Sequence, residues 1–136
     1  MNQNKQADGY NVIVAGAGMV GACAALSFAR KGFRVALVEP SPAIKKAGSA
    51  DIAADAVYDT RLSAISPTSQ KVLGDLGVWS AIDQNRVCDY EKMFVWHANG
   101  NAAVDFDCAQ VASQSLGAIV ENNQILAAVH KACQAE

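Results

Sequence analysis

The sequence predicts an α/β fold that opens with a parallel β-α-β unit, and three observations support this prediction. Residues 10–15 form a short apolar run rich in β-branched side chains, as in a buried parallel strand. A glycine-rich segment leads from this run into residues 19–31, whose composition favours a helix. Residues 33–39 then form a second strand-like run. This order of elements favours a right-handed crossover between two parallel strands.

The ends of these elements have recognisable signals. Arg30 and Lys31 fall in the last turn of the predicted helix, and Gly32 suits the position just after it. The segment Pro40-Ser41-Pro42 follows the second strand-like run and ends it. The β-α-β unit is therefore predicted to occupy residues 10–39.

The turn between the first strand and the helix has the pattern G-x-G-x-x-G, as Gly16-Ala17-Gly18-Met19-Val20-Gly21. The first glycine permits a tight turn, the second lets the backbone approach a pyrophosphate, and the third allows close packing of helix on sheet. Free N–H groups and the helix dipole favour an anion here. All six residues are therefore candidates for binding a dinucleotide.

An acidic residue stands where this motif requires one. Glu39 ends the second strand-like run and lies 18 positions after Gly21, close to the spacing of the carboxylate that binds ribose hydroxyls. A carboxylate there repels a 2′-phosphate, so the pattern favours FAD or NAD over NADP. FAD and NAD both present ADP to such a site, and these residues do not separate them.

The rest of the chain predicts a loop, a helix, a hairpin and a second helix. Residues 43–60 lack a clear period and are expected to form a loop, with a helical turn within it as an alternative. Ser66 suits the N-cap of a helix that begins at Pro67 and ends before Gly77. Residues 92–107 contain two strand-like runs around Asn99-Gly100, which is a strong hairpin signal.

The last predicted helix occupies residues 122–135. Asn122 or Asn123 is expected to cap it. Two tryptophans, Trp79 and Trp96, are expected in the core.

Composition narrows the class of protein. The chain has 136 residues, of which 51% are hydrophobic and 18% charged, and this balance excludes a disordered chain. A net charge of −2 does not indicate the excess of basic residues that is typical of nucleic-acid-binding proteins. The length predicts one domain or part of a larger one.

An uncharged stretch from Gly9 to Ala29 is long enough to span a bilayer, so a membrane helix or signal peptide is an alternative for it. Three features favour the α/β interpretation: the glycine spacing, the change from β-branched to alanine-rich composition, and Asp8 just before the stretch.

Several segments resemble the FAD-dependent aromatic hydroxylases of ubiquinone biosynthesis, of the octaprenylphenol hydroxylase type. The resemblance covers nearly the whole chain. The matching segments are residues 12–21, 35–40, 59–67, 76–79, 93–96 and 119–122. The most specific of them is Asp59-Thr60-Arg61-Leu62-Ser63-Ala64-Ile65-Ser66-Pro67.

The resemblance implies a Rossmann-like FAD-binding domain interleaved with a substrate domain whose main sheet is antiparallel. In this interpretation the hairpin at residues 92–107 leads into that substrate domain, and most of the domain is missing from this chain. The implied activity is hydroxylation of a polyprenylated phenol with O₂ and NAD(P)H. FAD carries such chemistry, so neither a catalytic side chain nor a metal ligand is expected.

The resemblance also implies three further cofactor-binding residues. Arg61 corresponds to an arginine that reaches FAD, and a guanidinium can pair with phosphate or stack on a ring. Glu121 and Asn122 match the segment that approaches the flavin end. His97 stands where the family often has an aspartate, so no role is carried over to it.

Two departures from the family concern length. Residues 43–58 look longer than the family's usual connection, and later motifs that complete FAD binding are absent. The chain is therefore expected to be an N-terminal portion that is inactive by itself. A stand-alone FAD- or NAD-binding module and a non-functional truncated product are the alternatives. The expected location is cytoplasmic, with an association at the inner membrane or with a ubiquinone-biosynthesis complex left open.

Overall fold

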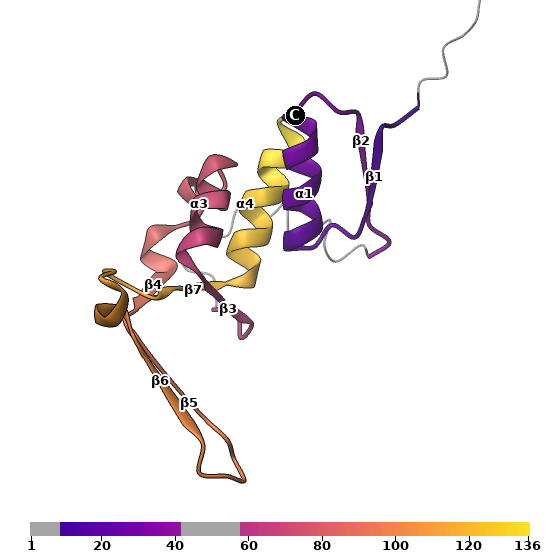
Figure 1. Ribbon diagram of the computed structural model, residues 1–136. Helices are drawn as coiled ribbons and strands as arrows, with labels where there is room; N and C mark the ends of the chain where they lie inside the picture. Colours follow the sequence, from indigo (N-terminus) through magenta and orange to yellow (C-terminus); the bar gives the residue numbers. More distant parts are fainter. Residues whose placement is uncertain (1–8, 42–57) are drawn as a thin grey trace, which may run out of the picture.

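The computed structural model describes residues 9–41 and 58–136, in which helices alternate with small sheets (Figure 1). In chain order the elements are β1 (Val12–Ala15), α1 (Met19–Ala29), β2 (Val35–Val38), β3 (Leu62–Ile65), α3 (Pro67–Asp75), η1 (Trp79–Ala81), η2 (Gln84–Arg86), β4 (Val87–Tyr90), β5 (Lys92–Trp96), β6 (Ala103–Asp107), η3 (Cys108–Val111), β7 (Gly117–Glu121) and α4 (Asn122–Gln134). The loop predicted for residues 43–60 lies mostly outside the described residues.

The predicted β-α-β unit is present. Strands β1 and β2 pair in parallel, with Val12 opposite Val35 and Ala15 opposite Val38, and α1 connects them. Gly32 follows α1 with a φ of +83°, which is the left-handed conformation expected after a helix end. The uncharged stretch is therefore divided between a strand and a helix of 11 residues. No helix in the described ranges is long and apolar enough to cross a membrane.

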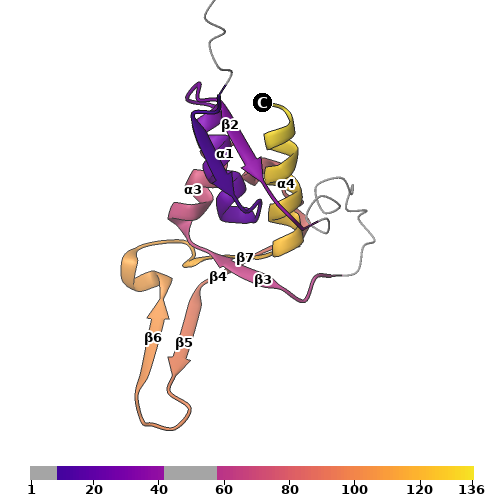
Figure 2. The same ribbon diagram turned by 90° about the vertical axis from the view of Figure 1, so that its right-hand side faces the viewer.

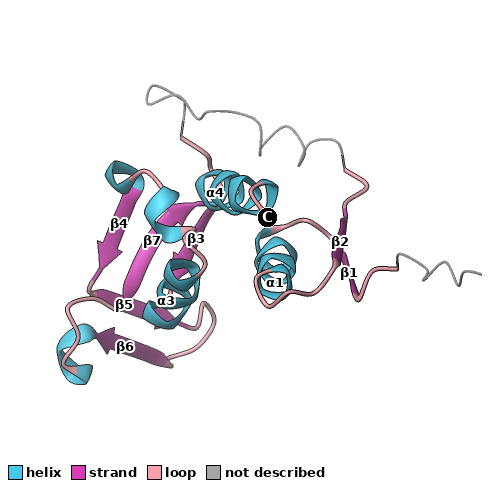
Figure 3. Ribbon diagram, turned by 90° about the horizontal axis from the view of Figure 1, so that it is seen from above, coloured by secondary structure: helices cyan, strands magenta, loops and turns pink. Residues whose placement is uncertain are grey.

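The β1–β2 sheet is covered on one face only by the described residues. Helix α1 lies against one side of it, as the view from above shows (Figure 3). On the other face the side chain of Ile13 is 68% exposed. The apolar run was expected to be buried on both faces, as in most parallel sheets, and for Ile13 this expectation is wrong.

A three-stranded antiparallel sheet lies beyond the helices, and sequence patterns missed it. Its order is β3-β7-β4, with Ser63 opposite Val120 and Val120 opposite Val87. The described strands form three separate sheets, so the hairpin shares no sheet with the parallel strands. Strands β3 and β4 have four residues each, and apolar and polar residue types do not alternate along either sequence, so no local signal marked them.

The core lies between α1, α3, α4 and the central strand β7. Helices α1 and α4 pack side by side, as both side views show (Figures 1 and 2). The core residues are Ala22, Leu26, Leu73, Leu76, Val78, Ile82, Ala118, Val120, Ile125, Ala128 and Val129. Residues from four elements that are distant in sequence therefore share a single apolar cluster, which fixes α4 against the β-α-β unit.

The two later helices begin differently. For α3 the prediction is confirmed: the Ser69 N–H donates to Oγ of Ser66, the N-cap, and Pro67 is the first helical residue. For α4 the prediction is wrong, because Glu121 occupies the N-cap position without a side-chain capping bond among the described residues. Asn122 is already helical, and its side chain binds a strand instead.

The predicted hairpin is formed by β5 and β6, which extend away from the rest of the described chain (Figure 2). The His97 N–H donates to the Ala102 carbonyl oxygen at 3.0 Å next to the turn. Phe94 and Trp96 stack with ring centroids 5.8 Å apart. The prediction that Trp96 is a core residue is wrong, because it is 67% exposed.

We predict that the hairpin causes self-association of this chain. Exposed apolar residues are concentrated on it, and contiguous patches of this kind favour protein–protein contact. The double change Phe94→Thr and Trp96→Thr is expected to reduce association in sedimentation velocity while leaving the melting temperature within a few degrees. As a control, Val120→Thr in the buried strand β7 should lower the melting temperature clearly. Unchanged association in the double variant would contradict the prediction.

Candidate functional site

The candidate site begins at the turn between β1 and α1. Gly16 has a φ of +97°, a conformation that side chains other than glycine rarely adopt. Its N–H donates to the carbonyl oxygen of Val38 at 2.7 Å, which ties the turn to the end of β2. The two predicted halves of the motif, the glycine turn and the end of the second strand, are therefore joined directly.

The other two glycines have different surroundings. A Cβ atom built on Gly21 would lie 1.9 Å from the carbonyl oxygen of Gly16, so helix and turn approach too closely for any side chain. A Cβ atom on Gly18 would meet no heavy atom of the described residues within 4 Å. Gly21 is thus required by packing within the protein. The space beside Gly18 is open to a ligand.

Glu39 organises the turn through its carboxylate. Oε2 accepts the Ala17 N–H at 2.9 Å, and Oε1 accepts the Ser41 N–H at 2.8 Å. These bonds, first that from Ala17 and then that from Ser41, hold the pKa of the Glu39 carboxyl below its ordinary value. Each oxygen retains a second lone pair, so the carboxylate can still accept a hydroxyl proton. Glu39 is half-buried, with access for a ligand.

A residue that the sequence did not point to completes this part of the site. The imidazole Nε2 of His130 lies 2.6 Å from the carbonyl oxygen of Ala17. His130 comes from α4, 113 positions away in the chain. No spacing rule links these residues, and only the buried face of α4, which includes Val129, could have suggested that His130 points inward.

Arg61 and Asn122 meet at a second cluster, where β3 pairs with β7. The Asn122 N–H donates to the Arg61 carbonyl oxygen at 3.0 Å, and the Ser63 hydroxyl donates to Oδ1 of Asn122 at 2.6 Å. The Arg61 side chain is 76% exposed and lies 3.9 Å from the Asp59 carboxylate. Its guanidinium is therefore accessible to a ligand.

Glu121 lies in the same cluster but is buried, with only 2% of its surface exposed. Its carboxylate forms a bidentate ion pair with Arg86, at 2.6 Å from Nε to Oε1 and 2.8 Å from Nη2 to Oε2. It also accepts the Asp59 N–H, and Arg86 stacks over the Tyr58 ring at 4.4 Å. The Arg86 guanidinium holds the pKa of the Glu121 carboxyl below its ordinary value. Whether Glu121 contacts a cofactor stays a prediction.

Helix α4 connects the two clusters. Asn122 is its first residue and His130 follows eight positions later, which is about 12 Å along a helix axis. The predicted residues Met19 and Val20 lie in the first turn of α1; Met19 packs on the core and Val20 is exposed. The candidate site thus has one part at the glycine turn and another at the start of α4.

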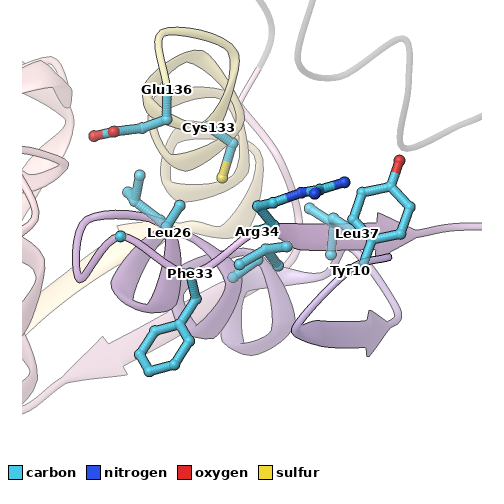
Figure 4. A pocket seen from close by; sticks show the side chains of 11 residues that line it. Tyr10, Leu26, Phe33, Arg34, Leu37, Cys133 and Glu136 are labelled. Carbon is cyan, nitrogen blue, oxygen red and sulfur yellow. The ribbon is translucent and has the colours of Figure 1, made fainter. Parts of the chain in front are cut away.

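A cavity of about 480 Å³ lies at the opposite end of α1 from the glycine turn (Figure 4). Phe33, Arg34 and Leu37 from the β2 region line it together with Leu26 of α1 and Cys133 of α4. Its lining includes none of the predicted cofactor-binding residues. Volume alone therefore does not locate the candidate site in this chain.

A glycine turn between a parallel strand and its helix, with a carboxylate from the next strand bound to that turn, defines a dinucleotide-binding protein. The model of the FAD-dependent oxidoreductase family matches residues 11–132. The chain belongs to this family. The match includes every residue of both clusters.

Among curated proteins, the chain is similar to ubiquinone-pathway hydroxylases. It is 36% identical over 124 residues to the 3-demethoxyubiquinol 3-hydroxylase of Escherichia coli K12, which covers 91% of this chain and 30% of that protein. It is 34% identical over 129 residues to the mitochondrial ubiquinone biosynthesis monooxygenase COQ6 of Danio rerio, covering 92% of this chain and 25% of that protein. The human counterpart is 31% identical over 128 residues, covering 93% and 26%. The chain therefore spans less than a third of the length of these relatives.

We predict opposite effects for two neighbouring glycines. Gly21→Ala places Cβ against the Gly16 carbonyl and should lower the melting temperature and abolish FAD binding. Gly18→Ala has room and should keep the melting temperature within a few degrees while weakening FAD binding. Circular dichroism and FAD titration measure the two effects. Gly74→Ala, at an open position on α3, is the control with unchanged binding. A wild-type melting temperature for Gly21→Ala would contradict the prediction.

We predict that the Arg86–Glu121 pair stabilises the fold in a pH-dependent way. Glu121→Gln removes the buried negative charge that forms the bidentate pair with Arg86 and should lower the melting temperature by roughly 10 °C at neutral pH. The pKa of Glu121 is lowered in the folded state from its ordinary 4.5, so the ionised carboxylate contributes stability above that value. This contribution disappears as the pH falls through the folded-state pKa. The difference in melting temperature between wild type and Glu121→Gln should therefore become smaller.

The exposed pair Lys71–Asp75 supplies the control for this measurement. Its atoms are 3.0 Å apart but both side chains are mostly exposed, so Asp75→Asn should change the melting temperature by about 1 °C or less. Thermal unfolding followed from neutral pH to pH values below 4.5 tests both variants. A gap for Glu121→Gln that stays constant over this range would contradict the assignment.

Proposed function

We propose that this chain forms the N-terminal, FAD-binding part of a monooxygenase that hydroxylates a polyprenylated phenol in ubiquinone biosynthesis, with NAD(P)H as reductant. The observation that supports this most directly is the contact between Glu39 and Ala17, which brings the acidic residue onto the glycine turn. Family membership supports FAD as the cofactor. The similarity to ubiquinone-pathway hydroxylases supports the substrate class.

The first cluster, which consists of the glycine turn (residues 16–21) and Glu39, fits the ADP half of FAD. The open space beside Gly18 would accommodate a pyrophosphate, and backbone N–H groups at the start of α1 would bind it with help from the helix dipole. The Glu39 carboxylate would accept the ribose hydroxyls with its remaining lone pairs. Its negative charge would repel a 2′-phosphate, so the site favours FAD or NAD over NADP.

The second cluster is proposed to serve the flavin end. Arg61 offers an exposed guanidinium and Asn122 lies directly beside its backbone. Glu121 would act through Asp59, because its buried carboxylate holds the Asp59 N–H and so fixes the segment that leads to Arg61. The separation of about 12 Å along α4 allows the two clusters to bind different parts of one extended cofactor.

When bound, FAD would supply the redox and oxygen chemistry of hydroxylation. The residues of this chain would bind and orient it, and no side chain is assigned a catalytic role. The hairpin β5–β6 is proposed to belong to the substrate layer, since its exposed apolar side chains suit contact with further parts of a longer protein. A polyprenyl substrate lies in a membrane, so the whole enzyme is proposed to act at a membrane surface, from the cytoplasmic side.

We predict that the chain binds FAD more tightly than NAD or NADP, and that Glu39→Gln weakens FAD binding roughly 10- to 100-fold, as expected for loss of a charged acceptor. The same change should reduce the discrimination against NADP, because the repelling charge is gone. Titrations followed by flavin fluorescence and by calorimetry measure these affinities.

Asp75→Asn is the control for this titration, since it removes an exposed carboxylate on α3, far along the chain from the turn. Equal FAD affinity in wild type and Glu39→Gln would exclude the ribose role of Glu39. Binding of NAD in preference to FAD would favour a stand-alone NAD-binding module instead.

A further inference from the structure

The imidazole of His130 is a buried polar group that the proposed function does not yet use. It lies on the inner side of α4 with 9% of its surface exposed, among the apolar residues that join α4 to α1. Its Nε2 is 2.6 Å from the carbonyl oxygen of Ala17, itself a buried residue of the glycine turn. A carbonyl oxygen only accepts hydrogen bonds, so Nε2 carries the proton and donates it.

This hydrogen bond fixes the direction of the next N–H group in the turn. A trans peptide is planar, and its C=O and the following N–H point in opposite directions. The described residues contain no cis peptide bond. Since the Ala17 carbonyl points inward to His130 of α4, the Gly18 N–H points the opposite way, out of the protein core. That side is where a Cβ atom on Gly18 would find open space.

The preceding peptide is fixed in the same manner. The Ala17 N–H points to Glu39 at 2.9 Å, and the Gly16 carbonyl points the opposite way, toward Gly21. Two side chains from different elements, Glu39 and His130, therefore hold two consecutive peptide planes of the turn. A buried carbonyl that loses its donor must rotate or stay unsatisfied, and rotation would move the Gly18 N–H with it.

We infer that His130 is a positioning residue for pyrophosphate binding: by donating to the Ala17 carbonyl, it keeps the Gly18 N–H directed at the phosphate oxygens. This inference rests on the proposed dinucleotide site and adds to it a residue from the last helix. The ligand chemistry involved is that of a diphosphate ester. The adenosine part of the ligand would contact Glu39 and does not depend on His130.

Binding of ADP and of adenosine by the same chain separates this role from a general structural one. In His130→Leu the donor is lost and the apolar volume is kept, so ADP affinity should fall about tenfold or more while adenosine affinity changes by about twofold or less. His130→Gln keeps an N–H donor on a side chain of similar reach and should restore much of the ADP affinity. NMR titration also follows the Gly18 amide, which should shift with ADP in wild type and not in His130→Leu.

Val129→Ala is the matched control, because it removes a fully buried side chain next to His130 without touching the turn. It should lower the melting temperature and leave the ratio of ADP to adenosine affinity unchanged. Retention of wild-type ADP affinity and of the Gly18 shift in His130→Leu would overturn the role of His130 alone. A parallel loss of ADP and adenosine binding, without rescue by Gln, would overturn it in favour of a structural role. Absence of ADP binding in the wild-type chain would overturn the proposed site as well.

Discussion

The candidate site depends on how the Ala17 peptide group is held. The Ala17 N–H donates to the Glu39 carboxylate, and the Ala17 carbonyl accepts from the His130 imidazole. The turn between β1 and α1, the end of β2 and helix α4 are therefore joined at this one residue. The contact of Gly16 with Gly21 closes the remaining side of the turn. Hydrogen bonds to buried or half-buried partners have fixed directions, and this restricts the turn to one geometry. A site that binds an anion through backbone N–H groups requires such restriction, because an N–H group points at the anion only when its peptide plane is held in place.

The second cluster uses a different physical device. Arg86 and Glu121 are buried together, and the bidentate geometry offsets part of the cost of removing both charges from water. The pair does not face solvent. It anchors the Asp59 backbone, and through β3 and β7 it fixes the position of Arg61, whose own side chain remains exposed. The buried Arg86–Glu121 pair thus holds the backbone in place, whereas the nearby Arg61 guanidinium stays accessible.

Sequence patterns predicted the parts of this structure that are set locally. The β-α-β unit, the Ser66–Pro67 helix start and the Asn-Gly hairpin follow from signals only a few residues apart. Glu39 was predicted because the spacing within a β-α-β unit is nearly constant. The sheet β3-β7-β4, the Arg86–Glu121 pair and His130 were missed, since each depends on contacts between residues 27 or more positions apart. Trp96 was misplaced because an aromatic residue in a strand carries no sign of which face, if any, will be covered.

The position of His130 in the chain has a consequence for synthesis on the ribosome. The β-α-β unit ends at Glu39, yet the group that fixes its turn emerges 91 residues later, a delay of roughly 5 to 20 s at ordinary translation rates. During this interval the strand and helix can form, but the Ala17 carbonyl lacks its donor. If His130 directs the Gly18 N–H as inferred, the nascent chain would bind a pyrophosphate about tenfold more weakly until α4 has docked on α1. A chain interrupted before α4 would then bind the cofactor less tightly than a chain in which the whole segment through α4 has folded.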